Sequence, residues 1–182
     1  MCIRDRLASI QFFVTNSLDR KKQQAYLEKL SYRDMLTGLY NRNRYIERLE
    51  AYKQVQDQQI GAIYIDLNGL KKVNDEQGHR AGDELIVRAA GTIAGIFAED
   101  AYRVGGDEFV VILLDVSREE FARKTEQLRR QMQENSVDAS IGGVWQASTE
   151  NLENLLRRAD ENMYREKKRY HSQADAAQKP EN

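Results

Sequence analysis

The segment Arg103-Val-Gly-Gly-Asp-Glu-Phe109 decides the fold, because it joins two short apolar stretches through a pair of glycines. The flanking residues 101–104 and 109–114 are rich in β-branched and aromatic side chains, which favour strands. Paired glycines permit positive φ and therefore a tight turn. The sequence thus predicts a β-hairpin that presents two adjacent carboxylates, Asp107 and Glu108, at its tip.

A second apolar stretch, residues 60–67, reads Ile-Gly-Ala-Ile-Tyr-Ile-Asp-Leu and predicts a buried strand with Asp66 near its end. If this strand and the hairpin are neighbours in one sheet, Asp66, Asp107 and Glu108 converge. Carboxylates that share a site raise one another's pKa unless a cation lies between them. Mg²⁺ suits such a site, because it binds one or two carboxylates together with water and phosphate, as in nucleotidyl transfer.

Two alternatives to a magnesium site arise from the residues alone. The hairpin carboxylates could be ordinary turn residues, and Asp66 an ordinary strand end. A calcium loop that starts at Asp66 is the second alternative, but it needs an oxygen ligand at its fifth position, Gly at its sixth and a bidentate Glu at its twelfth. Those positions hold Leu70, Lys71 and Gln77, which contradict the pattern.

The rest of the chain alternates helical and strand patterns. Asn41 and Ser117 are typical helix N-caps, and Glu120 completes a capping-box pattern after Ser117. The order predicts an α/β (α+β) sandwich with helices on a central, mostly antiparallel sheet. The predicted elements are a helix over 41–56, a polar loop over 68–82, helices over 83–97 and 117–135, a strand over 137–145 and a helix over 151–169.

Composition excludes several classes of protein. The 182 residues include 28 Lys+Arg and 29 Asp+Glu, and the single cysteine excludes a disulfide framework or a cysteine-based zinc cluster. No apolar run approaches the roughly 18–20 residues that span a bilayer. Residues 34–156 carry 14 basic and 21 acidic side chains, which gives no support for nucleic-acid binding. We expect a cytoplasmic location, either as a free protein or as the cytoplasmic end of a longer one.

Residues 7–32 carry apolar side chains at roughly helical spacing and predict a helix. It is either a packing helix or a two-stranded coiled coil that relays a signal from an upstream module. We expect residues 1–30 to be a helical linker whose fused sensor domain is missing from this chain. Residues 31–170 are predicted to form one domain, and residues 171–182 a disordered tail.

The hairpin resembles the signature of the GGDEF-domain diguanylate cyclases, which condense two GTP molecules into cyclic di-GMP. Further motifs resemble the family in the family's own order, from about residue 31 to residue 170, and jointly they are highly specific. They are Asp34-Met-Leu-Thr-Gly-Leu-Tyr-Asn-Arg42, Asp66-Leu-Asn-Gly-Leu-Lys-Lys-Val-Asn-Asp75, Gly78-His-Arg-Ala-Gly-Asp83, Ala139-Ser-Ile-Gly142, and Ala159-Asp-Glu-Asn-Met-Tyr164 with Lys167.

The resemblance implies a nucleotidyl-cyclase or palm-like sandwich and a reaction that depends on Mg²⁺ or Mn²⁺ and releases two pyrophosphates. It implies metal ligation by Asp66, the backbone carbonyl of Leu67, Asp107 and Glu108. The last two are the candidate catalytic residues, and we favour Asp107 for helping to deprotonate the attacking 3′-hydroxyl. Because each domain holds one GTP, the resemblance also implies that catalysis requires a homodimer.

The resemblance assigns three residues to the nucleoside. Asn74 and Asp83 match the pair that reads guanine, because a carboxylate accepts from N1–H and the exocyclic amine while an amide reads the remaining edge. His79 matches a residue near the nucleotide. From the residues alone, apart from the resemblance, we would interpret Asn74 as a turn residue, Asp83 as a helix N-cap and His79 as a residue that orders its loop.

Four residues are assigned to the phosphates in the same way. Lys71 and Lys167 match positions close to the triphosphate, although each could equally be a solvated surface lysine. Gly105 and Gly106 would let phosphate approach the backbone closely, because no side chain intervenes.

The sequence also departs from the family pattern. Asn68 replaces the second aspartate of the metal loop and Leu70 its usual phenylalanine, but neither change removes an expected metal ligand. Tyr170 and His171 stand where the family commonly has Gly-Arg, so one phosphate contact is weakened. The product-inhibition motif Arg-x-x-Asp is replaced by Ile96-Phe-Ala-Glu99, which predicts weak inhibition by cyclic di-GMP through that route.

A catalytically silent module that binds GTP or cyclic di-GMP and signals through partners is the alternative function. The intact pair of Asp107 and Glu108 argues against it, since degenerate family members usually lose that pair.

Overall fold

The computed structural model describes residues 31–55 and 57–177 and is built around a five-stranded sheet with the order β1-β3-β4-β2-β5. The β1–β3 pair is parallel, whereas the other three pairs are antiparallel. The predicted mostly antiparallel sheet is therefore confirmed. The two-residue strand at its edge was not predicted from the sequence. The strands are β1 (Tyr40–Asn41), β2 (Ile60–Leu67), β3 (Ala101–Arg103), β4 (Glu108–Leu114) and β5 (Ala139–Gln146).

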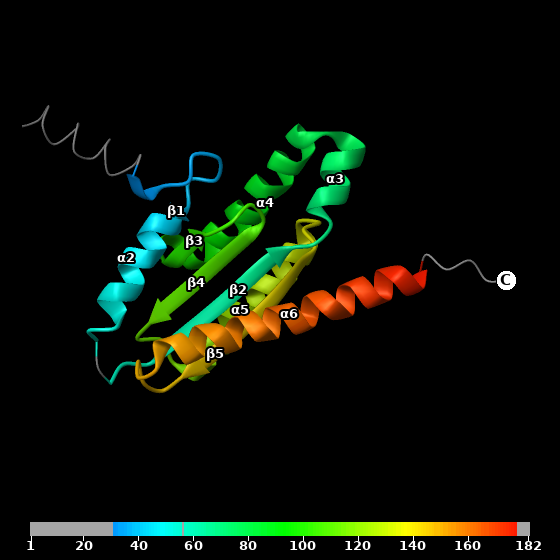
Figure 1. The fold of residues 1–182 in the computed structure, drawn as a ribbon. Helices are drawn as coiled ribbons and strands as arrows, with labels where there is room; N and C mark the ends of the chain where they lie inside the picture. The colour runs from blue at the N-terminus through cyan, green and yellow to red at the C-terminus, as the bar shows by residue number, and fades with distance from the viewer. Residues whose placement is uncertain (1–30, 56, 178–182) are drawn as a thin grey trace, which may run out of the picture.

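Helices cover both faces of the sheet, which confirms the α+β sandwich (Figure 1). Odd-numbered β2 residues such as Ile63 and Ile65 pack against α4 and α5, whereas Ile60 and Ala62 pack with residues of α2 and α6 on the opposite face. None of the helices in the described part has the length and apolarity of a membrane span. The helices are α2 (Arg42–Tyr52), α3 (Leu70–Gln77), α4 (His79–Phe97), the 3₁₀ turn η1 (Ala98–Asp100), α5 (Arg118–Glu134) and α6 (Leu152–Ala177).

The polar loop predicted over residues 68–82 is wrong, because α3 and the first turn of α4 occupy most of it. Helix α3 buries no residue, so it carries no apolar stripe from which a helix could be predicted. Two glycines with positive φ mark its ends, Gly69 at +71° and Gly78 at +85°. Their conformation allows the chain to turn sharply from β2 into α3 and from α3 into α4.

The last helix is longer than predicted, since α6 ends at Ala177 rather than near residue 169. The expected disordered tail is therefore helical as far as residue 177, and residues 178–182 lie outside the described part. The apolar pattern stops near residue 169, whereas Gln173 and the three alanines among residues 174–177 favour a helix without contributing to such a pattern. The predicted helix over 7–32 also lies outside the described residues, apart from its last two.

Both predicted N-caps are confirmed. The Asn41 side chain accepts a hydrogen bond from the Arg44 amide at 3.2 Å, and Ser117 accepts one from the Glu120 amide at 3.1 Å. The capping box is only half formed, because the Glu120 carboxylate pairs with Lys124 at 3.2 Å.

Helix α6 crosses β5 in direct backbone contact at Gly142. A Cβ atom placed on Gly142 would lie 2.1 Å from the Met163 nitrogen and 2.2 Å from the Ala159 carbonyl oxygen. Backbone atoms cannot swing aside as a flexible side chain can, so glycine is required where the helix meets the strand.

We predict that Gly142→Ala lowers the free energy of unfolding by on the order of 3 kcal/mol, because the new methyl group would force α6 away from the sheet. Gly91→Ala is the matched control, since Gly91 is exposed on α4 and a Cβ atom placed there would meet nothing within 4 Å. It should raise stability by about 0.5–1 kcal/mol through helix propensity. Urea unfolding of the two variants measures both effects, and equal stabilities would contradict the close contact.

Candidate active site

The site begins with a buried carboxylate at the end of the interior strand β2, which is paired on both sides. Asp66 is only 3% exposed and stands opposite Glu108 on β4 and Ser140 on β5. Its Oδ2 atom accepts a hydrogen bond from Lys167 of α6, with Nζ at 2.8 Å. The other oxygen, Oδ1, is buried and has no hydrogen-bond partner among the described residues. A buried carboxylate oxygen without a partner is costly, so Asp66 can take a further cation or donor.

Burial shifts the pKa values of both Asp66 and Lys167. Loss of water raises the pKa of Asp66, and the neighbouring Lys167 ammonium only partly opposes that rise. Burial also works against the charge of Lys167, but its hydrogen bond and ion pair with Asp66 outweigh this and raise the pKa of the lysine. The lysine therefore stays charged, while the carboxylate lacks part of the positive charge that would stabilise it fully.

The hairpin forms as predicted and lies beside Asp66. The Leu67 amide donates to the Asp107 carbonyl at 3.1 Å, and the Val104 amide donates to the Glu108 carbonyl at 3.0 Å. The expectation of positive φ at the two glycines is wrong, because neither Gly105 nor Gly106 adopts it. The Glu108 side chain lies over Gly105 instead, since a Cβ there would lie 2.5 Å from its Oε2 atom.

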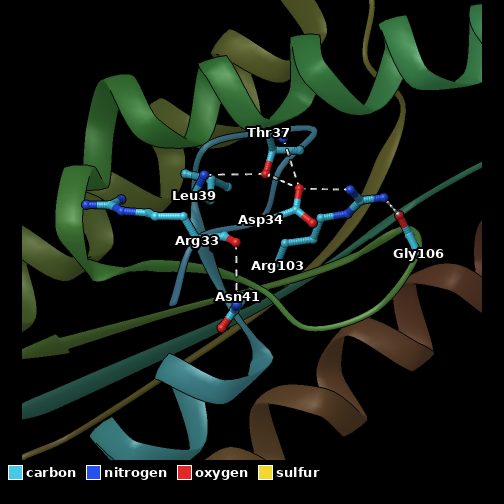
Figure 2. Close-up of polar contacts among 7 residues, drawn as sticks. All are labelled: Arg33, Asp34, Thr37, Leu39, Asn41, Arg103 and Gly106. Carbon is cyan, nitrogen blue, oxygen red and sulfur yellow. Dashed lines mark hydrogen bonds and ion pairs between the residues drawn. The ribbon is translucent and has the colours of Figure 1, made fainter. Parts of the chain in front are cut away.

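An arginine ties the hairpin to the segment that opens the domain (Figure 2). Arg103 donates to Oδ1 of Asp34 at 2.9 Å and to the Gly106 carbonyl at 2.7 Å. The same Asp34 oxygen accepts from the Thr37 amide at 2.9 Å and from the Thr37 hydroxyl at 2.7 Å. One carboxylate oxygen thus joins the turn after residue 34 to the hairpin tip, and this fixes where the tip stands.

Two clefts border the hairpin. The first, of about 630 Å³, lies between the β2–α3 connection, the hairpin and α6. The second, of about 420 Å³, lies between α3, the start of α4 and the hairpin. Predicted site residues that line the first are Leu67, Lys71, Asp107 and Lys167, and those that line the second are Lys71, Asn74, His79, Gly106 and Asp107.

The structure therefore brings most of the predicted nucleotide residues together on both sides of Asp107. Asp83 and Gly105 are the exceptions, since neither lines a cleft, and Asp83 is exposed on α4. Asn74 is held against the same helix, because a Cβ on Gly82 would lie 2.0 Å from its Oδ1 atom.

The strand that carries Asp66 and the hairpin that carries Asp107 and Glu108 are neighbours, as expected. The three carboxylate groups themselves do not come together, which corrects the expected convergence. Within the described ranges, no three His, Cys, Asp or Glu side chains lie close enough to hold a metal ion. The Glu108 side chain lies beside Gly105, and Asp66 is paired with Lys167. The donors nevertheless fit a hard cation in kind, because carboxylate and carbonyl oxygens are the ligands Mg²⁺ prefers and Oδ1 of Asp66 lacks a partner within those ranges.

Sequence reasoning missed two residues of the first cleft. Tyr170 and His171 line it beside Lys167, and their rings make an edge contact with centroids 5.6 Å apart. In the sequence they stand out only as departures from the family pattern, and the predicted helix ends before them. Their spacing from Lys167, three and four residues, is the signal that places them on the same face of a longer helix.

Comparisons with known proteins bear on this arrangement. Residues 31–173 match the family model described as diguanylate cyclase, GGDEF domain. Diguanylate cyclase DgcS of Shewanella oneidensis is 33% identical over 147 residues, which cover 74% of this chain and 49% of that protein. The chain spans about half the length of the curated relatives that it matches.

Two further similarities add context. Cyclic di-GMP phosphodiesterase PdeR of Escherichia coli is 34% identical over 107 residues, or 57% of this chain and 16% of that protein. The crystal structure of the coiled coil and GGDEF domain of DgcB from Caulobacter crescentus, in complex with c-di-GMP, gives a TM-score of 0.71 at 23% identity. It covers 92% of this chain and 95% of that chain, which shows that the fold is shared.

We predict that Asp34→Asn destabilises the protein in a pH-dependent way. Burial disfavours the charged carboxylate, but hydrogen bonds from Thr37 and Arg103 outweigh it and lower the pKa of Asp34. Because the pKa is lowered in the folded protein, the ionised carboxylate stabilises the fold at pH values above the ordinary aspartate pKa of about 3.9. This stabilisation is lost as the pH falls through the pKa that Asp34 has in the folded protein. Urea unfolding should show a loss of about 1–3 kcal/mol at pH 7 that shrinks below about pH 4.

The control for this experiment is Asp57→Asn on an exposed turn, expected to change stability by less than about 0.5 kcal/mol. A loss at Asp34 of the same size at every pH would show that the negative charge is not what holds the hairpin.

Proposed function

The chain belongs to the family of diguanylate cyclase GGDEF domains, and from this we propose that it condenses two GTP molecules into cyclic di-GMP and two pyrophosphates. The family itself places the chain in cyclic di-GMP signalling. The observation that carries the proposal is the buried Asp66, whose Oδ1 lacks a partner in the described structure, one strand away from the intact carboxylates of Asp107 and Glu108.

Each part of the site has a task in this reaction. Asp66, the Leu67 carbonyl, Asp107 and Glu108 would hold Mg²⁺ or Mn²⁺, which when bound polarises the α-phosphate and stabilises the leaving pyrophosphate. The exposed Glu108 side chain would leave Gly105 to do so. Asp107 lines both clefts and is therefore placed to take the proton of the attacking 3′-hydroxyl.

The remaining residues bind and orient the nucleotide. Lys167 and Lys71 line the cleft next to Asp107, where their charges would neutralise the triphosphate. Asn74 and His79 line the second cleft, which suits the nucleoside, and Asp83 would reach guanine from the neighbouring turn of α4. Gly106 lines that cleft without a side chain and leaves room for phosphate.

One domain binds one GTP, so we propose that two copies meet with their hairpins facing each other to form both new phosphodiester bonds. Residues 1–30 would serve as the linker that aligns the copies, driven by an upstream sensor. Because GTP is the proposed substrate, we propose that the reaction takes place in the cytoplasm.

A silent GTP- or cyclic di-GMP-binding module is the second candidate. The observation in its favour is that Lys167 already occupies Oδ2 of Asp66 while the three carboxylates stay apart. If a metal ion cannot replace Lys167 at Asp66 and draw the three carboxylates together, the domain would bind GTP without converting it to product.

Incubation of the full chain with GTP and Mg²⁺ should yield cyclic di-GMP, and chelation of the metal should abolish it. Glu108→Gln keeps the shape of the side chain but removes its charge, so the rate should fall at least about 100-fold. Glu119→Gln, on the exposed first turn of α5, is the control and should retain full activity. GTP binding by calorimetry without any product from the parent chain would favour the silent module.

We also predict weak product inhibition. Glu99, the last residue of the segment that replaces the inhibitory motif, pairs with Arg33 at 2.7 Å on the protein's own surface. The pair leaves that side chain less free to bind a ligand, and the motif's arginine is absent. Titration of activity with cyclic di-GMP should show inhibition only by competition with GTP. Tight non-competitive inhibition would contradict this.

A further inference from the structure

Strand β5 lies at the edge of the sheet, so one side of its backbone has no strand partner among the described residues. At Ile141, two side chains form the backbone hydrogen bonds that a strand partner would otherwise form. Glu166 of α6 accepts a hydrogen bond from the Ile141 amide at 3.1 Å, and Arg129 of α5 donates to the Ile141 carbonyl. The two side chains also pair, with Nη1 of Arg129 2.7 Å from Oε1 of Glu166. Together they supply the acceptor and the donor that a neighbouring strand would supply.

The Arg129–Glu166 pair joins helices from opposite faces of the sheet around this edge, because α5 and α6 pack on different faces. One turn earlier in α6, Asn162 donates to the Gly143 carbonyl at 3.3 Å. Asn162 and Glu166 are four helical residues apart, a rise of about 6 Å, and their partners Gly143 and Ile141 are two strand residues apart, a rise of about 6.6 Å. Both contacts can therefore form at once, and they align α6 along β5.

The aligned segment ends at the candidate active site. Glu166 directly precedes Lys167, whose ammonium pairs with Asp66, and Ser140, next to Ile141 on β5, stands opposite Asp66. In the part of the chain that the structure describes, no residue of α6 beyond Glu166 hydrogen-bonds to the backbone of the sheet. The Arg129–Glu166 pair is thus the last attachment before Lys167.

We propose that Arg129 and Glu166 are positioning residues that set where Lys167 stands and thereby how tightly the cleft binds the phosphates of the nucleotide. Without them, the turn of α6 that carries Lys167 loses its hydrogen bonds to the β5 edge, and its nearest remaining attachment to β5 is the Asn162 contact one turn earlier. The lysine would then lose its fixed place between Asp66 and the cleft. This proposal rests on the proposed cyclase function for its kinetic consequence, but not for its structural one.

The kinetic test uses Arg129→Met and Glu166→Gln in the full chain. We expect Arg129→Met to raise KM for GTP about tenfold with kcat changed less than about twofold, because ground-state binding of the phosphates is weakened. Glu166→Gln should raise KM about threefold, since its amide oxygen still accepts from Ile141. The double variant should be no worse than Arg129→Met, because the two residues act as one unit, and Arg129→Lys should recover part of the loss.

The matched controls remove the neighbouring surface pairs. Arg130→Met disrupts the exposed pair of Arg130 with Glu134 on α5, and Glu161→Gln disrupts the exposed pair of Arg157 with Glu161 on α6. Both controls should leave KM and kcat unchanged. An unchanged KM in Arg129→Met together with a lower unfolding midpoint would overturn the proposal and leave the pair a role in stability alone.

Hydrogen–deuterium exchange separates this proposal from the proposed function. In Arg129→Met, amides of residues 164–171 should exchange faster, while those of residues 153–160 exchange at the parental rate. If the parent neither binds GTP nor makes product, the proposed function fails, yet this exchange pattern would still support the positioning role. Parental exchange over residues 164–171 would refute it.

Discussion

A buried carboxylate at the end of the interior strand β2 is the constraint on which this architecture depends. Asp66 is almost fully buried between two neighbouring strands, and within the described structure one of its oxygens has no partner. A carboxylate in that position is costly unless positive charge is brought to it. The chain meets part of this need with Lys167, which lies 101 residues further along. The placement of α6 is therefore a condition for tolerating Asp66, and Gly142 is the point at which the helix comes close enough.

The two sides of the candidate site are held by different means. Asp66 lies on a strand paired on both sides, so its place follows from the sheet itself. The hairpin tip is exposed, and its place follows from Arg103, which reaches both Asp34 and the Gly106 carbonyl. The opening segment of the domain thus controls one side of the site, and α6 controls the other.

The parts of this structure that can be predicted from sequence are those with a periodic or steric signal. The strand over 60–67 is predicted to the residue, because its apolar β-branched run is typical of a buried strand and is bounded by polar residues. Helix α3 has no buried residue, and the two-residue strand β1 is too short for any period, so neither leaves a local pattern. Ion pairs such as Lys167 with Asp66 depend on which helix crosses which strand. That information lies in the tertiary packing of segments far apart in the chain, not in local pattern.

The contrast between buried and exposed carboxylates also says which parts of the site can move. Moving Asp66 would break the pairing of β2 with both neighbours, whereas Glu108 is exposed and its side chain lies beside Gly105. A cation that enters the site therefore finds one fixed ligand and one that must turn toward it. Because the fixed ligand has an oxygen without a partner in the described structure, its unsatisfied charge provides the driving force, and the exposed side chain supplies the adjustment. The cost of burying Asp66 and the metal binding that we propose for it are then two consequences of the same placement.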